Sequence, residues 1–145
     1  MSEKPKGLIL FVCVENTFCS VIAEALFNYY AHSGWRAESA GVKPAAEINA
    51  VAVQLLGELQ IKIPEKKPRL VTPQLVTVAS RVITFGCLDR CPIGAKEKSE
   101  DWPIPGSVGK DGFLRPREEL LAIRGEIERR VLKLIHELDH TSETE

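Results

Sequence analysis

The first part of the chain places a cysteine between a strand pattern and a helix pattern. Residues 8–12 are a continuous apolar run, which is typical of a strand buried on both faces. Cys13 and a short polar segment follow, and then apolar residues recur at helical spacing until Gly34: Ile22, Ala25, Leu26 and Tyr29. A strand, loop and helix in this order predict a parallel sheet covered by helices, with the loop at the carboxyl end of the strand.

The rest of the chain continues to alternate between the two patterns. We expect short strands at residues 36–39 and 82–85 and a short helix at residues 72–79. A second helix is marked by Ala52, Leu55, Leu56 and Leu59. A long amphipathic C-terminal helix is marked by Leu120, Ile123, Ile127, Val131, Leu134 and Leu138.

Length and charge narrow the class of protein. At 145 residues and 44% hydrophobic content the chain can bury one core, so we expect a single domain over residues 1–145. The net charge is -1 with both signs interspersed, which argues against a nucleic-acid or membrane partner. The apolar stretch at residues 8–14 is short and lacks a cleavage site, so we expect a cytoplasmic protein. In the reducing cytoplasm, unpaired cysteines are more often catalytic than structural.

The segment from Cys13 to Ser20 has the layout of a loop that binds an oxyanion. Successive backbone N–H groups, together with a helix N-terminus, attract a tetrahedral anion, and the same field favours a thiolate over a thiol. A thiolate placed there could attack phosphorus or arsenic. The alternative is a buried core thiol, because unpaired cysteine is among the most buried residue types. The predicted anion-binding loop comprises Val14, Glu15, Asn16, Thr17, Phe18, Cys19 and Ser20.

Several segments together resemble one family. They are residues 10–17 with Ser20 and residues 23–25, residues 39–41, and residues 84–92, followed by residues 100–102 and 109–110. These segments resemble the low-molecular-weight protein tyrosine phosphatases, and the later ones resemble the arsenate reductase branch. The resemblance implies the α/β fold of that family: a single-domain three-layer sandwich with a four-stranded parallel sheet and helices on both faces.

All four cysteines, at positions 13, 19, 87 and 91, fall within residues 10–25 and 84–92, which carry the resemblance. In arsenate reductases a loop thiolate forms an adduct with arsenate, a second cysteine attacks it to release arsenite, and a third resolves the disulfide. The resemblance gives these roles to Cys13, Cys87 and Cys91. It implies a small oxyanion, arsenate or phosphate, as substrate, no tightly bound cofactor, and a thioredoxin-like protein or low-molecular-weight thiol as reductant. The alternatives for Cys87 and Cys91 are two inert thiols at a strand end or a metal clip with Cys13 and Cys19. The five residues between Cys13 and Cys19 fit the clip poorly, so we predict no metal.

Two positions depart from the family pattern. The loop arginine of the C-x5-R-S motif is replaced by Cys19, and Gly106-Ser107 stands where the family has its Asp-Pro general acid. Losing a donor to an oxyanion typically costs about 2.7–4 kcal/mol. Arsenate can supply its own protons, whereas a phenolate leaving group needs the missing acid. We therefore expect arsenate reduction, with or without a loss of rate. The alternatives are a low-activity phosphatase homologue and a non-catalytic oxyanion or thiol-redox sensor.

The sequence leaves three questions about helper residues open. Cys19 is a protective second thiol, a natural loss of function or an engineered replacement, and Arg36 and Arg90 are candidates for the missing charge. Asn16 and Ser20 are expected to shape the loop. In some arsenate reductases the positions that match Asn16, Glu24 and Ser39 bind potassium, so a potassium ion stays possible; ordinary capping is the alternative.

One further motif resembles a zinc site. Residues 136–140 have the HExxH pattern, which on a helix can present two imidazoles to a zinc ion. The motif lies near the chain end without a downstream third ligand. We therefore interpret it as the solvated end of the last helix, where positive charge is favoured by the helix dipole.

Overall fold

The computed structural model describes residues 7–31, 34–63, 66–86 and 96–143. Its centre is a four-stranded sheet in the order β2-β1-β3-β4, in which each neighbouring pair is parallel. The strands are β1 (Gly7–Cys13), β2 (Trp35–Gly41), β3 (Arg81–Thr84) and β4 (Ser99–Asp101). The predicted four-stranded parallel sheet is thus confirmed.

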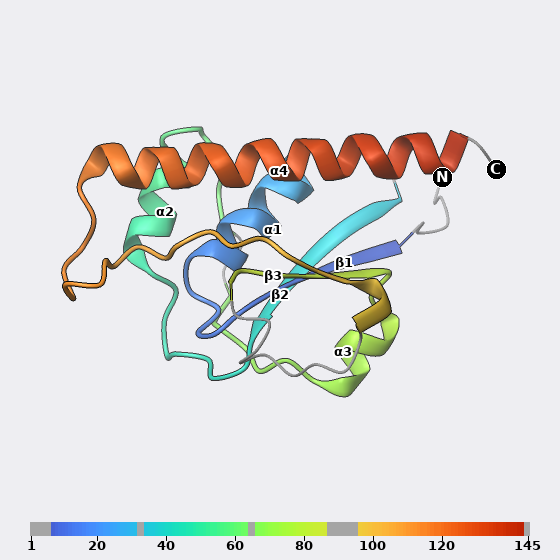
Figure 1. Cartoon of the computed structure of the whole chain (residues 1–145), viewed down its shortest axis with the longest axis horizontal. Helices are drawn as coiled ribbons and strands as arrows, with labels where there is room; N and C mark the ends of the chain where they lie inside the picture. Colours follow the sequence, from blue (N-terminus) through green and yellow to red (C-terminus); the bar gives the residue numbers. More distant parts are fainter. Residues whose placement is uncertain (1–6, 32–33, 64–65, 87–95, 144–145) are drawn as a thin grey trace.

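Helices cover both faces of the sheet (Figure 1). One face carries α1 (Cys19–Tyr30), α2 (Ala50–Gly57) and α4 (Arg117–Glu143), and the other carries α3 (Pro73–Val78); a short 3-10 helix, η1 (Lys96–Lys98), precedes β4. The apolar run of β1 serves both layers. Ile9 and Phe11 pack in the cluster under α1 and α4, whereas Leu10 and Val12 pack with Val76 of α3.

The C-terminal helix α4 is the largest element and follows its predicted apolar pattern. Leu120, Ile127 and Leu138 are all buried against the sheet and α1. A hydrogen bond of 2.6 Å from the Tyr30 hydroxyl to Glu128 ties α1 to this helix. In the part of the chain that the structure describes, α4 and the other helices lack the long apolar run that a membrane crossing needs.

The strand β4 is the element whose position the sequence did not reveal. Its three residues, Ser99–Asp101, are polar and show no apolar alternation. They form a strand because they pair with β3, where Thr84 Oγ1 donates to Asp101 Oδ1 at 2.5 Å. Trp102 follows at once and is buried under α4, so β4 closes one edge of the core beneath that helix.

Candidate active site

Cys13 is the last residue of β1 and lies at the carboxyl-end rim of the central strand. Its side chain is half-buried and packs against the core under α1. Its Sγ lies 2.9 Å from Ser20 Oγ, in the first turn of α1. The two groups are in hydrogen-bond contact and either atom can be the donor, so Cys13 has a polar partner at the rim where a nucleophile would stand.

The carbonyl groups of the loop after Cys13 are bound on one side by residues 42–49. The carbonyls of Cys13, Val14, Glu15 and Thr17 accept hydrogen bonds from the backbone N–H groups of residues 42, 43, 45 and 49, at 2.8–3.3 Å. Among the hydrogen bonds that join described residues, none uses the N–H of residues 14–18 as donor. Four carbonyls of the loop are therefore satisfied by residues 42–49, whereas its N–H groups are not used by described residues and are available to an anion.

The start of α1 contributes further donors. Its N-cap residue is Phe18, which makes no side-chain capping hydrogen bond. Phenylalanine cannot cap, so the first N–H groups of the helix have no capping partner, and helix N-termini of this kind attract anions. Ser20 does not cap the helix, since its hydroxyl faces Cys13 and Asn16 instead.

Gly41 lets β2 approach the loop closely. A Cβ at this position would lie 2.7 Å from the carbonyl oxygen of Val14 and 2.9 Å from the N atom of Asn16. Backbone atoms cannot give way as a flexible side chain does. Glycine at the end of β2 is therefore a condition for the loop shape.

Asn16 holds the loop from inside. Its φ of 57° lies in the left-handed region, which asparagine tolerates better than most residues. Its side chain is 1% exposed. Nδ2 donates to Ser20 Oγ at 3.0 Å and to Ser39 Oγ at 2.9 Å, and Oδ1 accepts from the Arg69 N–H at 3.0 Å. All three polar positions of the amide are used, so its orientation is fixed.

Glu24 extends this buried polar group away from the loop. Ser39 Oγ donates to Glu24 Oε1 at 2.5 Å, and both carboxylate oxygens lie 2.5 Å from Lys66 Nζ. A potassium ion would need these oxygens as ligands. Because the Lys66 ammonium contacts both of them and Asn16 Oδ1 accepts from Arg69, the residues present do not fit a potassium site.

Cys19 differs from Cys13 in its burial and in its hydrogen-bond partner. It is 4% exposed, and its Sγ donates to the carbonyl of Pro105 at 3.4 Å. Burial, and secondarily the nearby Cys13, raise the pKa of the Cys19 thiol far above its ordinary value. Cys19 is therefore a neutral thiol at the position where the family arginine would bring charge.

Arg36 does not replace that charge. It pairs with Leu8 at the start of β1, roughly 16 Å along the strand from Cys13. Its guanidinium forms a hydrogen bond with Glu38 instead.

The second candidate, Arg90, lies outside the described residues, as do Cys87 and Cys91. The last described residue before Cys87 is Gly86, which follows the carboxyl end of β3. Its N–H donates to the side chain of Asp101 in β4.

Ser107 occupies the region of the missing general acid. It is buried, and its Oγ accepts from Asn49 Nδ2 at 3.1 Å. The Asn49 N–H in turn bonds the Thr17 carbonyl of the loop. The nearby carboxylate of Asp111 accepts from the Phe113 N–H within its own turn. Ser107 has no carboxyl group, and the Asp111 carboxylate is hydrogen-bonded within its own turn. Neither side chain therefore stands in for the general acid of the family.

The sequence did not reveal Lys66, Arg69 or Asn49 as neighbours of the loop. Arg69 and Lys66 lie far from residues 13–20 in the chain, in a segment for which the sequence predicted neither a strand nor a helix. Arg69 also bonds the Ser39 carbonyl through Nε and Glu38 through Nη2. No local pattern marks such contacts, because the bridge between Gly41 and Leu70 creates them.

The described residues contain no group of three or more His, Cys, Asp and Glu side chains that could hold a metal ion. The HExxH segment lies on α4, and the side chain of His140 is outside the description.

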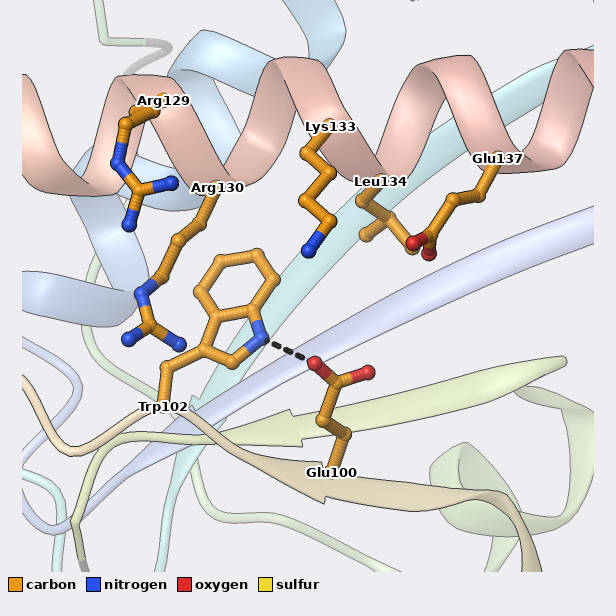
Figure 2. A pocket seen from close by; sticks show the side chains of 7 residues that line it. All are labelled: Glu100, Trp102, Arg129, Arg130, Lys133, Leu134 and Glu137. Carbon is orange, nitrogen blue, oxygen red and sulfur yellow. Dashed lines mark hydrogen bonds between the residues drawn. The ribbon is translucent and has the colours of Figure 1, made fainter.

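A cavity of about 200 Å³ lies beside the HExxH segment (Figure 2). It is lined by Glu100, Trp102, Arg129, Arg130, Lys133, Leu134 and Glu137. Trp102 Nε1 donates to Glu100 there, and the cavity includes no residue of the loop after Cys13.

Comparison with known proteins gives consistent matches. Residues 8–90 match the family described as low molecular weight phosphotyrosine protein phosphatase. An arsenate reductase of Shouchella clausii is 30% identical over 132 residues, which cover 88% of this chain and 94% of that protein. The thioredoxin-dependent arsenate reductase of Corynebacterium glutamicum has a TM-score of 0.70 and 33% identity over 91% of this chain, which spans 63% of that protein's length. The YwlE arginine phosphatase of Geobacillus stearothermophilus has a TM-score of 0.78 at 26% identity, over 93% of this chain and 94% of its own.

Proposed function

Since the chain belongs to the low molecular weight phosphotyrosine protein phosphatase family of enzymes, we propose that it reduces arsenate to arsenite through a relay of cysteine thiols. The observation that carries this proposal is the position of Cys13. Its Sγ lies 2.9 Å from a hydroxyl at the start of α1, beside a loop whose N–H groups are not used by other described residues. The similarity to arsenate reductases supports arsenic as the target of attack.

The first step is attack of the Cys13 thiolate on arsenic. A sulfur–arsenic bond forms and one oxygen leaves as water, having taken protons that arsenate itself carries. The loop N–H groups of residues 14–18 bind the remaining oxygens and stabilise their charge. The product is a covalent adduct of arsenic(V) on Cys13.

The second step uses the thiols at positions 87 and 91. The Cys87 thiolate attacks the sulfur of Cys13, and the electron pair of the sulfur–arsenic bond stays on arsenic, which leaves as arsenite. Cys91 then attacks the sulfur of Cys87 and frees the Cys13 thiolate. A thioredoxin-like protein or a small thiol reduces the resulting disulfide between Cys87 and Cys91. The thioredoxin-dependent relative supports an external thiol of this kind.

Phosphatase activity is expected to be the weaker activity. The phosphatase reaction must protonate its leaving group, and Ser107, hydrogen-bonded to Asn49, stands where the family acid would be. Loss of a general acid typically lowers the rate by about a hundredfold to ten thousandfold. Arsenate reduction tolerates that loss better because its leaving group is water.

The test compares two reactions on the same purified chain. Arsenite formation is measured with a thioredoxin system and with a small dithiol, and hydrolysis of an aryl phosphate is measured in parallel. We expect arsenite to form in the first assay and hydrolysis to stay close to background. Cys87→Ser should release no arsenite, whereas Cys91→Ser should release a single equivalent per chain and stop.

Three outcomes contradict the proposal. Efficient aryl phosphate hydrolysis without arsenite would assign the chain to the phosphatases. A Cys91→Ser variant that turns over repeatedly would remove Cys91 from the relay. Silence in both assays together with phosphate binding or reversible disulfide formation would identify an oxyanion or redox sensor, which the neutral Cys19 favours.

A further inference from the structure

A continuous series of side-chain contacts leads from Lys66 to the sulfur of Cys13. It runs from Lys66 Nζ to Glu24, Ser39, Asn16 and Ser20, with contact distances of 2.5–3.0 Å, and ends at Cys13 Sγ. We propose that Lys66 is a positioning residue for the Cys13 thiolate, a built-in cation that makes a bound potassium ion unnecessary. The inference deepens the proposed function and rests on it only for its activity measurements.

Burial makes the cation necessary. Glu24 is 7% exposed, and Ser39 is fully buried beside it. A buried carboxylate is costly unless it is paired and hydrogen-bonded. Lys66 contacts both oxygens of Glu24 from a segment that also carries Arg69, whose N–H holds Asn16. The charge of Lys66 therefore compensates the buried negative charge of the Glu24 carboxylate, whose oxygens only accept hydrogen bonds.

The direction of each hydrogen bond follows from that acceptor. Ser39 must donate to the carboxylate, so its oxygen accepts from one hydrogen of Asn16 Nδ2. The other hydrogen of the amide goes to Ser20 Oγ. The hydroxyl hydrogen of Ser20 is then left to point at Cys13 Sγ. A fixed acceptor at Glu24 thus favours the arrangement in which Ser20 donates to the thiolate.

The experiment measures alkylation of Cys13 by iodoacetamide, followed on the Cys13 peptide by mass spectrometry. The full chain and its Lys66→Met variant are compared in choline chloride and in potassium chloride at equal ionic strength. In choline chloride we expect the variant to react at least about fivefold more slowly, which is the effect of roughly one ordinary hydrogen bond. Potassium should restore at least half of the lost rate in the variant and leave the natural chain unchanged.

Three variants serve as controls. Lys67→Met removes a neighbouring lysine that only approaches the exposed Glu47, at 3.8 Å, so it should react like the natural chain. Lys66→Arg keeps the charge and should recover most of the rate. Adding Glu24→Gln to Lys66→Met removes the carboxylate, so potassium should then have no effect.

Two results overturn the inference. The first is a Lys66→Met variant that reacts at the natural rate in choline chloride, and the second is a natural chain that needs potassium for full reactivity or thermal stability. If Lys66→Met does not fold, the natural chain in choline and potassium chloride, together with Lys66→Arg, still decides the matter.

The alkylation assay needs no arsenate, so it separates this inference from the proposed function. Slow alkylation in Lys66→Met with no arsenite formed by any variant would retain the role of Lys66 and reject the arsenate chemistry. If the natural chain does form arsenite, the variant should lose kcat more than it raises KM, because the thiolate rather than substrate binding is affected.

Discussion

The two cysteines at the ends of the loop between β1 and α1 have opposite environments. Cys13 is half-buried and faces the hydroxyl of Ser20, whereas Cys19 is 4% exposed and donates to the carbonyl of Pro105. A hydroxyl donor favours a thiolate, and a carbonyl acceptor favours a thiol. The same side chain thus becomes a candidate nucleophile at one end and a core residue at the other, and the burial of Cys19 is the chief cause of the difference.

The contrast also bears on how the loop would bind the proposed anion. Position 19 carries a neutral thiol, so the loop lacks the planar guanidinium that the family arginine would place there. The proposed binding then depends on the backbone N–H groups of residues 14–18 and on the uncapped start of α1. The chain has the candidate nucleophile Cys13 and a loop of unused N–H groups, and it lacks the charged side chain.

The largest expected effect separates the two cysteines directly. Cys13→Ser should abolish arsenite formation, a loss of at least about a thousandfold, because a hydroxyl at this position stays un-ionised and cannot form the adduct. Cys19→Ser should keep the rate within about threefold, since position 19 only packs and donates to Pro105. The measurement is steady-state arsenite production. Equal losses in both variants would show that Cys19 takes part in the chemistry.

The second effect is a gain. Cys19→Arg should raise turnover at least about tenfold, because a guanidinium returns a bidentate contact to the anion. Cys19→Lys restores the charge without the planar fork and should gain less. Both variants should unfold at a lower temperature, since a larger side chain enters a buried position. A stable Cys19→Arg variant without a rate gain would show that the loop binds no anion.

The sequence predicted the architecture better than it predicted the contacts around Cys13. The apolar run of residues 8–12 and the helical spacing before Gly34 identified β1 and α1, because burial on both faces of a strand and one face of a helix leaves a local pattern. β4 left no such pattern, since Ser99–Asp101 is a strand only through its pairing with β3. The family resemblance supplied the strand number.

The candidate site was predicted in part for the same physical reason. Cys13, Asn16 and Ser20 are neighbours in sequence, so a motif brings them together. Lys66 reaches Glu24 only because the segment after residue 65 runs beside the end of β2. Long-range ion pairs of this kind have no local signature. The potassium expectation therefore came from matching Asn16, Glu24 and Ser39 alone, without the lysine that contacts the carboxylate.

The third effect tests the partner of Cys13. Ser20→Ala removes the hydroxyl at 2.9 Å and should slow alkylation of Cys13 about fivefold, the effect of roughly 1 kcal/mol. Ser80→Ala, which removes an exposed hydroxyl beside the start of β1, is the matched control and should change nothing. If Ser20→Ala reacts as fast as the natural chain, the hydroxyl does not stabilise the thiolate, and the contrast between the two ends of the loop weakens.

The last effect concerns the pH dependence of stability at the Cys19 end rather than the reaction rate. Burial raises the pKa of Cys19 in the folded chain, so above the ordinary thiol value of 9.0 the unfolded chain loses this proton and the folded chain keeps it. The stability that the group contributes is complete below that pH and declines above it, by up to about 1.4 kcal/mol per pH unit. Urea unfolding at several values between pH 8 and pH 10 should give a shallower slope for Cys19→Ala than for the natural chain. Tyr30, whose pKa is raised to about 12 chiefly by its hydrogen bond to Glu128, contributes equally to both chains and cancels in the difference. Equal slopes would mean that Cys19 ionises in the folded protein, and the two ends of the loop would then share one kind of thiol.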